Sequence, residues 1–126
     1  MIRFLSIDEV LDLYADSLGR FGGTYGLRDL ALLESALGQP ILLQQYDKHD
    51  IFELAAIYCF GIIKNHPFTD GNKRAGLLAA ITFLYNNGIE IECNFEDLYR
   101  LALGIADSSI KLPEITKFLH NAATIK

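Results

Sequence analysis

One predicted helix constrains the fold more than any other part of the sequence. The segment from about Asn72 to Asn86 carries apolar side chains almost all the way round, among them Ala75, Leu78 and Phe83. A helix of that kind lies in the middle of a domain, because each of its sides has to be covered by other apolar side chains. Its apolar run is too short to cross a membrane, which takes roughly 20 residues. The sequence therefore predicts a globular domain built around this helix, with no membrane partner.

Helical spacing and capping patterns account for most of the remaining chain. Ser6 followed by Glu9, and Asp50 followed by Glu53, have the form of capping boxes, which mark helix starts. The expected helices run from Ser6 to about Leu18, from Leu27 to about Leu37, from Asp50 to about Asn65, from Asn72 to about Asn86, from Phe95 to Ile105 and from Pro113 to about Ala123. We therefore expect an all-α fold, a compact helical bundle in one domain that covers residues 1–126.

Two stretches lack a helical pattern. Gly38 and Pro40 are expected to stop the second helix. The stretch Ile41–Tyr46 that follows has no helical period, so it is expected to be a short extended segment or a loop. In the stretch 89–93, apolar residues alternate with acidic ones, which predicts a short connecting strand.

Charge and cysteine content exclude several classes of protein. The chain holds 11 Lys and Arg against 16 Asp and Glu, a formal net charge of -5. This balance argues against direct nucleic-acid binding, which usually requires a basic surface, although it leaves room for one small basic site. The N-terminus shows no apolar stretch long enough for a signal peptide, so we expect a cytoplasmic protein. Cys59 and Cys93 stand far apart and are expected to be reduced thiols in the core.

One polar segment stands between two apolar helices: His66-Pro67-Phe68-Thr69-Asp70-Gly71-Asn72-Lys73-Arg74. Phe68 is expected to anchor it in the core. Its last residues begin a helix, where free N–H groups and a partial positive charge attract anions. Gly71 lets the backbone approach a ligand closely, while Lys73 and Arg74 add cations that oppose the helix dipole. Such a departure from a local rule is typical of functional sites, and we interpret the segment as a phosphate cradle.

Each polar residue of this segment also has a structural interpretation. Asp70 suits Mg²⁺, which takes carboxylate and phosphate oxygens, but Asp70 or Asn72 could equally be a helix N-cap. His66 suits a general base that accepts a proton from an attacking hydroxyl, yet a lone histidine is more often a structural hydrogen-bonding group. Lys73 or Arg74 alone is usually a solvated surface charge. Physical reasoning by itself thus predicts an anion-binding site without a named reaction.

The same segment resembles the signature of the Fic/Doc family, His-Pro-Phe-x-Asp/Glu-Gly-Asn-Gly/Lys-Arg, and fills every specified position. In addition, Arg20–Gly23, Gly26–Asp29 and Leu33–Leu37 are similar to the N-terminal half of the family's Doc (death-on-curing) branch. The resemblance covers nearly the whole chain. It implies a compact helical fold whose members transfer part of a nucleotide to a hydroxyl of a target protein.

The resemblance also implies roles for single residues. His66 would be the general base, and Asp70 would hold Mg²⁺. Gly71, Asn72 and Arg74 would bind the phosphates of the nucleotide, with Arg74 counted among the catalytic residues.

Lys73 distinguishes two subclasses of the family. Adenylyl-transferring members have Gly at this position, which leaves room for the nucleotide diphosphate, whereas Doc proteins have Lys. By resemblance, the lysine fills that space and reverses the nucleotide, so that the γ-phosphate of ATP faces the acceptor. A lysine also offers a point charge to a phosphate. The resemblance therefore implies a protein kinase that uses ATP and Mg²⁺, with Lys73 both catalytic and nucleotide-binding.

Partners follow from the same resemblance. Doc proteins are toxins of toxin–antitoxin pairs and act on translation components. The expected partners are a protein substrate with a Ser or Thr acceptor, such as an elongation factor, and an antitoxin that occupies the site. Two alternatives stay open, a Fic-like protein adenylyltransferase and a non-catalytic nucleotide- or peptide-binding module.

Two interpretations remain open for each of three further features. Ile41–Tyr46 stands where family members carry a flap that aligns the target through backbone pairing, and it could also be a plain apolar loop over the core. Arg28 could contact a ligand or form an ion pair with Asp29 or Glu34. Lys64 could reach the nucleotide or target, although a surface charge is the commoner role for such a residue.

Overall fold

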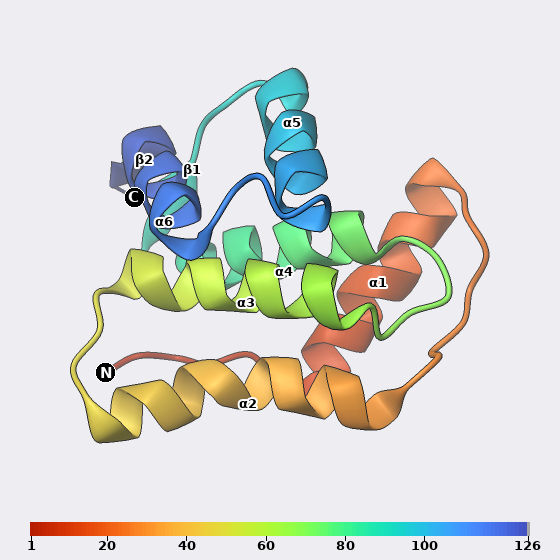
Figure 1. The fold of residues 1–126 in the computed structure, drawn as a ribbon, viewed down its shortest axis with the longest axis horizontal. Helices are drawn as coiled ribbons and strands as arrows, with labels where there is room; N and C mark the ends of the chain where they lie inside the picture. Colours follow the sequence, from red (N-terminus) through yellow and green to blue (C-terminus); the bar gives the residue numbers. More distant parts are fainter. Residues whose placement is uncertain (126) are drawn as a thin grey trace.

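Six helices and one small sheet make up residues 1–125, the part of the chain that the computed structural model describes (Figure 1). The helices are α1 (Ile7–Phe21), α2 (Leu30–Tyr46), α3 (Ile51–Asn65), α4 (Asn72–Asn86), α5 (Phe95–Ala106) and α6 (Leu112–Ala122). The strands β1 (Ile89–Ile91) and β2 (Ala123–Ile125) pair antiparallel, with Ile91 opposite Ala123. The predicted all-α fold is confirmed.

The helices α3 and α4 form the centre of the molecule. α3 contacts α2, α4, α5 and α6, while α4 contacts α1, α3, α5 and β1. Figure 1 shows the pair with α2 on one side and with α5 and α6 on the other. Because both central helices are covered on most sides, side chains from nearly every turn of them are buried. The loop that joins them is thus held between the two central helices of the fold.

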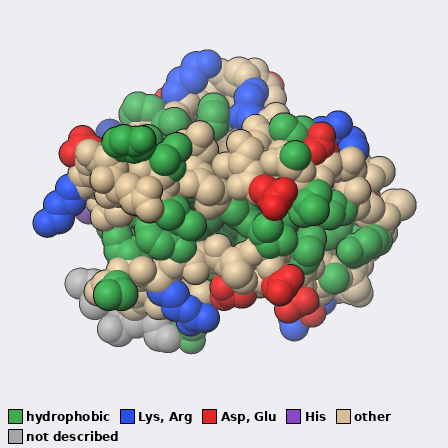
Figure 2. All heavy atoms as spheres, turned by 90° about the horizontal axis from the view of Figure 1, so that it is seen from below, with side chains coloured by type: hydrophobic (Ala, Val, Ile, Leu, Met, Phe, Trp, Pro, Cys, Tyr) green, Lys and Arg blue, Asp and Glu red, His purple; other side chains and the backbone are tan. Residues whose placement is uncertain are grey.

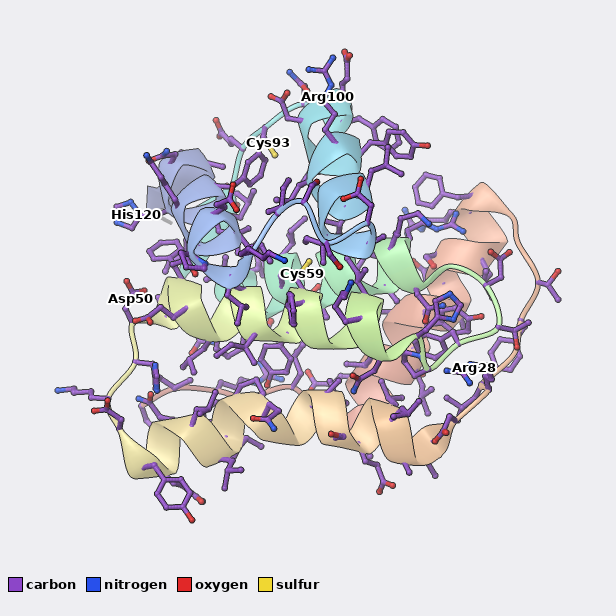
Figure 3. All side chains as sticks on the ribbon, in the orientation of Figure 1. Arg28, Asp50, Cys59, Cys93, Arg100 and His120 are labelled. Carbon is purple, nitrogen blue, oxygen red and sulfur yellow. The ribbon has the colours of Figure 1, made fainter. Side chains whose placement is uncertain are left out.

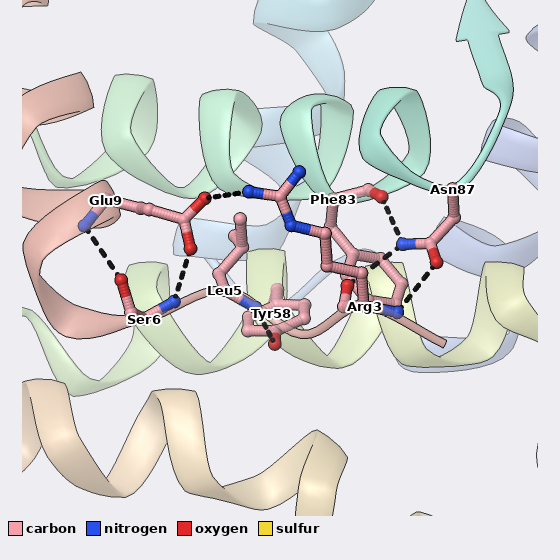
Figure 4. A network of polar contacts seen from close by, with 7 residues as sticks. All are labelled: Arg3, Leu5, Ser6, Glu9, Tyr58, Phe83 and Asn87. Carbon is pink, nitrogen blue, oxygen red and sulfur yellow. Dashed lines mark hydrogen bonds and ion pairs between the residues drawn. The ribbon is translucent and has the colours of Figure 1, made fainter. Parts of the chain in front are cut away.

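The N-terminal segment is tied to both central helices (Figure 4). The main chain of Arg3 exchanges two hydrogen bonds with the side chain of Asn87, at 2.9 and 3.0 Å. The backbone N–H of Leu5 donates to the buried hydroxyl of Tyr58 on α3, at 3.0 Å. These bonds fix the point at which α1 begins.

Two of the predicted helix starts are confirmed by their caps, whereas α2 begins at Leu30 and not at the expected Leu27. Both predicted capping boxes form, Ser6 with Glu9 and Asp50 with Glu53. The end of the first helix differs from the prediction, because α1 runs through Gly19 and stops only at Gly22, where φ is 83°. Nothing lies within 4 Å of the place where a Cβ of Gly19 would be, so this glycine is simply an exposed helical residue.

The prediction of an extended flap at Ile41–Tyr46 is wrong. This stretch is the last part of α2, and the helix passes through Pro40. A proline removes one helical hydrogen bond, but Leu33, Ala36, Leu37 and Pro40 are all buried at the spacing of one helix face. We attribute the continued helix to that packing. The backbone of this stretch is already used within the helix, so it offers no edge to an extended target.

The same helix carries an exposed apolar surface. Leu30, Ile41, Leu42 and Tyr46 are solvent-exposed. Figure 2 shows apolar side chains on the face seen from below, the side on which α2 lies, with acidic groups among them.

Two other expectations concern the burial of the cysteines and the lack of a membrane-spanning helix. Cys59 is a buried free thiol in α3, as expected, whereas Cys93 is exposed and the prediction of a core position for it is wrong. Within the described residues, no helix is long and apolar enough to cross a membrane.

Candidate functional site

A cleft of about 300 Å³ opens where α3 ends and α4 begins. Its size is at the lower end of the range for ligand pockets, about 300–1,000 Å³. Most of its lining comes from the segment that the sequence singled out: Ile63, Lys64, His66, Thr69, Asp70, Gly71, Asn72, Lys73 and Ala106. The structure therefore gathers His66, Asp70, Gly71, Asn72 and Lys73 around one space.

His66 closes α3 in an unusual backbone conformation. Its φ of 53° and ψ of 53° are left-handed, and its N–H still donates to the carbonyl of Ile62 at 3.1 Å. The following Pro67 disfavours a right-handed helical conformation at His66, which explains why the helix ends here. The chain turns away while the exposed imidazole stays on the wall of the cleft.

Phe68 anchors the loop in the core, as predicted. Its side chain is fully buried, and its ring stacks on that of Tyr14 in α1. The side chain of Asn72, which is only 5% exposed, accepts from the N–H of Phe68 and donates to its carbonyl, each at 2.9 Å. The amide of Asn72 is thus a brace inside the loop, and the backbone N–H of this residue is a further group that can bind a ligand.

The start of α4 carries no side-chain cap. Gly71 is the N-cap residue, with a φ of 82° that favours glycine, and no side chain bonds to the first N–H groups. Asp70 and Asn72 are therefore not caps, and the alternative that assigned them only this role is wrong. The first turn also lacks an acidic residue, so the dipole and the free N–H groups face the cleft uncompensated.

Asp70 is held at both its main chain and its side chain. Its carbonyl accepts from the hydroxyl of Tyr14 at 2.9 Å, and its carboxylate Oδ2 accepts from the N–H of Thr24 at 3.1 Å. One carboxylate on the cleft wall suits an ion such as Mg²⁺, which is commonly held by one or two carboxylates together with substrate phosphates. Among the described residues, no group of three or more His, Cys, Asp or Glu could hold a metal by itself.

The two cations at the start of α4 differ in their surroundings. Lys73 is exposed and lines the cleft. Arg74 points toward the end of α1 instead, where its Nη2 donates to the carbonyl of Gly22 at 3.0 Å. Its guanidinium also lies 5.6 Å from the ring centroid of Phe21. Of these two cations, Lys73 is therefore the one that lines the cleft.

A second segment, residues 24–29, lies along the loop, a contact that was not predicted from the sequence. The carbonyl of Gly26 accepts from the N–H of Thr69 at 2.8 Å, and the carbonyl of Pro67 accepts from the N–H groups of Arg28 and Asp29 at 2.8 and 3.0 Å. From the sequence, this segment was noted only for the similarity of Gly26–Asp29 to the Doc branch. The clustering of Gly22, Gly23 and Gly26 ahead of a polar loop was the signal that could have suggested a close approach of two loops.

Lys64 also lines the cleft. Its Nζ donates to the hydroxyl of Ser108 and to the carbonyl of Ala106, the latter at 3.5 Å. This lysine joins the end of α3 to the end of α5, so that α5 forms part of the cleft wall.

Comparisons with known proteins show which proteins this chain is similar to. The model of the Fic/DOC family matches residues 4–84, which include the whole loop and most of α4. The chain is 29% identical over 120 residues to the protein kinase doc of Escherichia phage P1, across 94% of each chain. It is 34% identical over 98 residues to the toxin Doc of Mycolicibacterium smegmatis, across 76% of this chain and 73% of that protein.

Proposed function

Because the chain belongs to the Fic/Doc family, we propose that it is a Doc-like toxin that transfers the γ-phosphate of ATP to a Ser or Thr hydroxyl of a target protein. The observation that carries the proposal is the cleft at the start of α4, which has His66, Asp70 and Lys73 on its wall. The names of the two relatives, a protein kinase and a toxin, support it.

Phosphate binding falls to the start of α4. The N–H groups that follow Gly71 have no side-chain cap, so they can donate to phosphate oxygens. Lys73 adds a positive charge from the same turn. Because both features belong to a helix packed in the centre of the fold, the phosphates would meet donors that are already in place, which is the main contribution of a protein to phosphoryl transfer.

Asp70 would hold Mg²⁺ against the phosphates. When bound, this ion neutralises part of the phosphate charge. The hydrogen bond from Thr24 to one carboxylate oxygen keeps the group at the cleft.

His66 would act as the general base. It accepts the proton of the acceptor hydroxyl, the acceptor oxygen forms a bond to the γ-phosphorus, and the bond from that phosphorus to the bridging oxygen breaks to leave ADP. The exposed imidazole at the rim of the cleft lets a protein substrate approach it from solvent.

Lys73 favours the γ-phosphate over the α-phosphate as the group transferred. Its side chain lies on the cleft wall beside Asp70 and Gly71, where a glycine would leave space for a diphosphate. A lysine there takes up that space and attracts the phosphate charge. The nucleotide would then enter with its γ-phosphate toward His66.

The partners are part of the same proposal. We infer that the target is a translation component such as an elongation factor, that a separate antitoxin covers the cleft, and that the protein acts in the cytoplasm. The exposed apolar surface of α2 described above is compatible with protein partners.

A growth assay tests the toxin proposal. Expression of the chain in a bacterial host should arrest growth, co-expression of its cognate antitoxin should restore growth, and His66→Ala at a matched protein level should be harmless. Arg100→Ala is the control, because the one contact of the Arg100 side chain found within residues 1–125 is an exposed pair with Glu96. Normal growth with the unaltered chain, or arrest by the His66→Ala variant, would contradict the proposal.

A further inference from the structure

We propose that Arg28 is a positioning residue that holds His66 in the conformation needed for proton transfer, an inference that rests on the proposed function. It acts through the main chain of His66. Arg28 is not among the residues that line the cleft, so it reaches the reacting groups only through its neighbour.

The backbone of His66 needs such support. A φ of 53° is uncommon for a residue with a side chain. Conformations of this kind persist where the surrounding structure holds them, and they gather at active sites. The direction of the imidazole follows from this backbone conformation, because the side chain leaves the main chain at the same Cα.

The guanidinium of Arg28 supplies that support. Its Nε and Nη2 donate to the carbonyl of His66 at 2.9 and 2.6 Å, and Nη2 also donates to the carbonyl of Asn65 at 3.2 Å. Figure 3 shows its side chain pointing from the segment before α2 toward the loop that follows α3. These carbonyls lie at the end of α3, where unpaired C=O groups and the helix dipole favour a cation.

The planar fork of an arginine suits this task better than a lysine would. Two N–H groups on one rigid plane fix both the position and the direction of the His66 carbonyl. Neither interpretation offered by the sequence, a ligand contact or an ion pair with Asp29 or Glu34, anticipated this contact.

The loop itself does not depend on the Arg28 side chain. The N–H groups of Arg28 and Asp29 donate to the carbonyl of Pro67, and the N–H of Thr69 donates to Gly26. These main-chain bonds remain when the side chain is shortened. Arg28→Ala should therefore release the carbonyl of His66 while it leaves the rest of the loop docked.

Kinetics give the first test. We would measure the initial rate at which γ-labelled ATP labels protein in a bacterial lysate, for the unaltered chain, Arg28→Ala, Arg28→Lys and Arg100→Ala. For Arg28→Ala we expect the rate at saturating ATP to fall roughly tenfold to hundredfold, because a small misplacement of a reacting group has effects of this size. The apparent KM for ATP should stay the same, since Arg28 touches none of the groups at the start of α4. Arg28→Lys should restore part of the rate, and Arg100→Ala should change nothing.

Nuclear magnetic resonance of the histidines gives a second test that needs no activity. The chain has three histidines, His49, His66 and His120, and the His66→Ala variant identifies the signal of His66. In Arg28→Ala, the Cα shift of His66 should move away from its left-handed value, while the signals of His49 and His120 stay in place.

The outcomes separate the two proposals. A displaced His66 signal with a lower rate and an unchanged KM supports the positioning role. An unchanged His66 signal would overturn it. A lower rate accompanied by shifts of the His49 and His120 signals as well would also overturn it, because the variant would then have disturbed the whole fold. If the unaltered chain labels no protein, the proposed function fails, and the shift of His66 alone decides whether Arg28 holds its backbone.

Discussion

The ring of Tyr14 in α1 lies 3.8 Å from the ring of Phe68, with an angle of 13° between their planes, and both side chains are fully buried. The hydroxyl of the same tyrosine donates to the carbonyl of Asp70 at 2.9 Å. It also accepts from the N–H of Gly26 at 3.3 Å. One side chain of α1 therefore connects the two loops that form the site.

Tyr14→Phe tests this connection. The stack on Phe68 should remain, while the carbonyl of Asp70 and the N–H of Gly26 lose their partner. Both bonds are part-buried, and a hydrogen bond typically contributes about 0.5–1.5 kcal/mol, so we expect the free energy of unfolding to fall by that amount in urea titrations. Tyr46→Phe, at an exposed tyrosine, is the control and should change the free energy by less than about 0.5 kcal/mol. Equal stability of the two variants would contradict the inferred role of the hydroxyl.

Gly76 sets how closely α3 and α4 approach. A Cβ at this position would lie 2.8 Å from Cγ1 of Ile63 and 3.0 Å from the carbonyl oxygen of Cys59. Gly76→Ala should therefore lower the free energy of unfolding by about 1–3 kcal/mol, the usual cost of overpacking.

Gly19→Ala is the matched control, because nothing lies within 4 Å of its Cβ position. Alanine favours helix over glycine by up to about 1 kcal/mol, so this variant should be as stable as the unaltered chain or more stable. A stabilising effect of Gly76→Ala in the same thermal or urea unfolding experiment would show that the helices can separate without cost.

The two cysteines should differ in reactivity. Burial raises the pKa of Cys59 to about 12, so its thiol stays protonated at neutral and mildly alkaline pH. Cys93 is exposed, and partial desolvation together with Asp97 raises its pKa above the ordinary value. Because alkylation requires the thiolate, iodoacetamide should label Cys93 with a rate that increases with pH, and it should leave Cys59 unmodified in the folded chain. Mass spectrometry of the digested protein measures how far each cysteine is labelled. Equal labelling of the two cysteines would contradict the burial of Cys59.

Lys73→Gly should change which phosphate is transferred. Removing the side chain opens space in the cleft beside Asp70 and Gly71, so a diphosphate could enter there and bring the α-phosphate toward His66. We expect labelling of protein from γ-labelled ATP to fall and labelling from α-labelled ATP to appear. The control is Lys117→Ala, because Lys117 is exposed on α6. Lys111 is not chosen, because it is the N-cap of that helix. A Lys73→Gly variant that still transfers only the γ-phosphate would show that this lysine does not set the orientation of the nucleotide.

Two helix starts were predictable because their signals are local. The capping boxes at Ser6 and Asp50 are written in four consecutive residues, and both form. The end of α2 was not predictable, because Pro40 opposes a helix locally and its burial with Leu37 became visible only in three dimensions. Strand β2 was missed for a similar reason, since three residues at a helix end become a strand only by pairing with β1.

The site also combines residues that the sequence indicated with contacts that only the structure shows. The residues of the loop carry their chemistry in one short segment, so the sequence indicated His66, Asp70 and Lys73, and the structure places all three on one cleft. The groups that hold the loop, Tyr14 and Arg28, act across 56 and 38 positions of the chain. No short sequence pattern predicts contacts between residues that are so far apart in the chain.

The most direct test of the proposed phosphoryl transfer follows the label of ATP. Purified chain is incubated with Mg²⁺ and a bacterial lysate, once with ATP labelled at the α-phosphate and once with ATP labelled at the γ-phosphate, each beside His66→Ala. We predict a protein band labelled only from the γ-phosphate and absent with His66→Ala. A band labelled only from the α-phosphate would identify an adenylyltransferase and contradict the role given to Lys73, and the absence of any band dependent on His66 would contradict catalysis by this cleft.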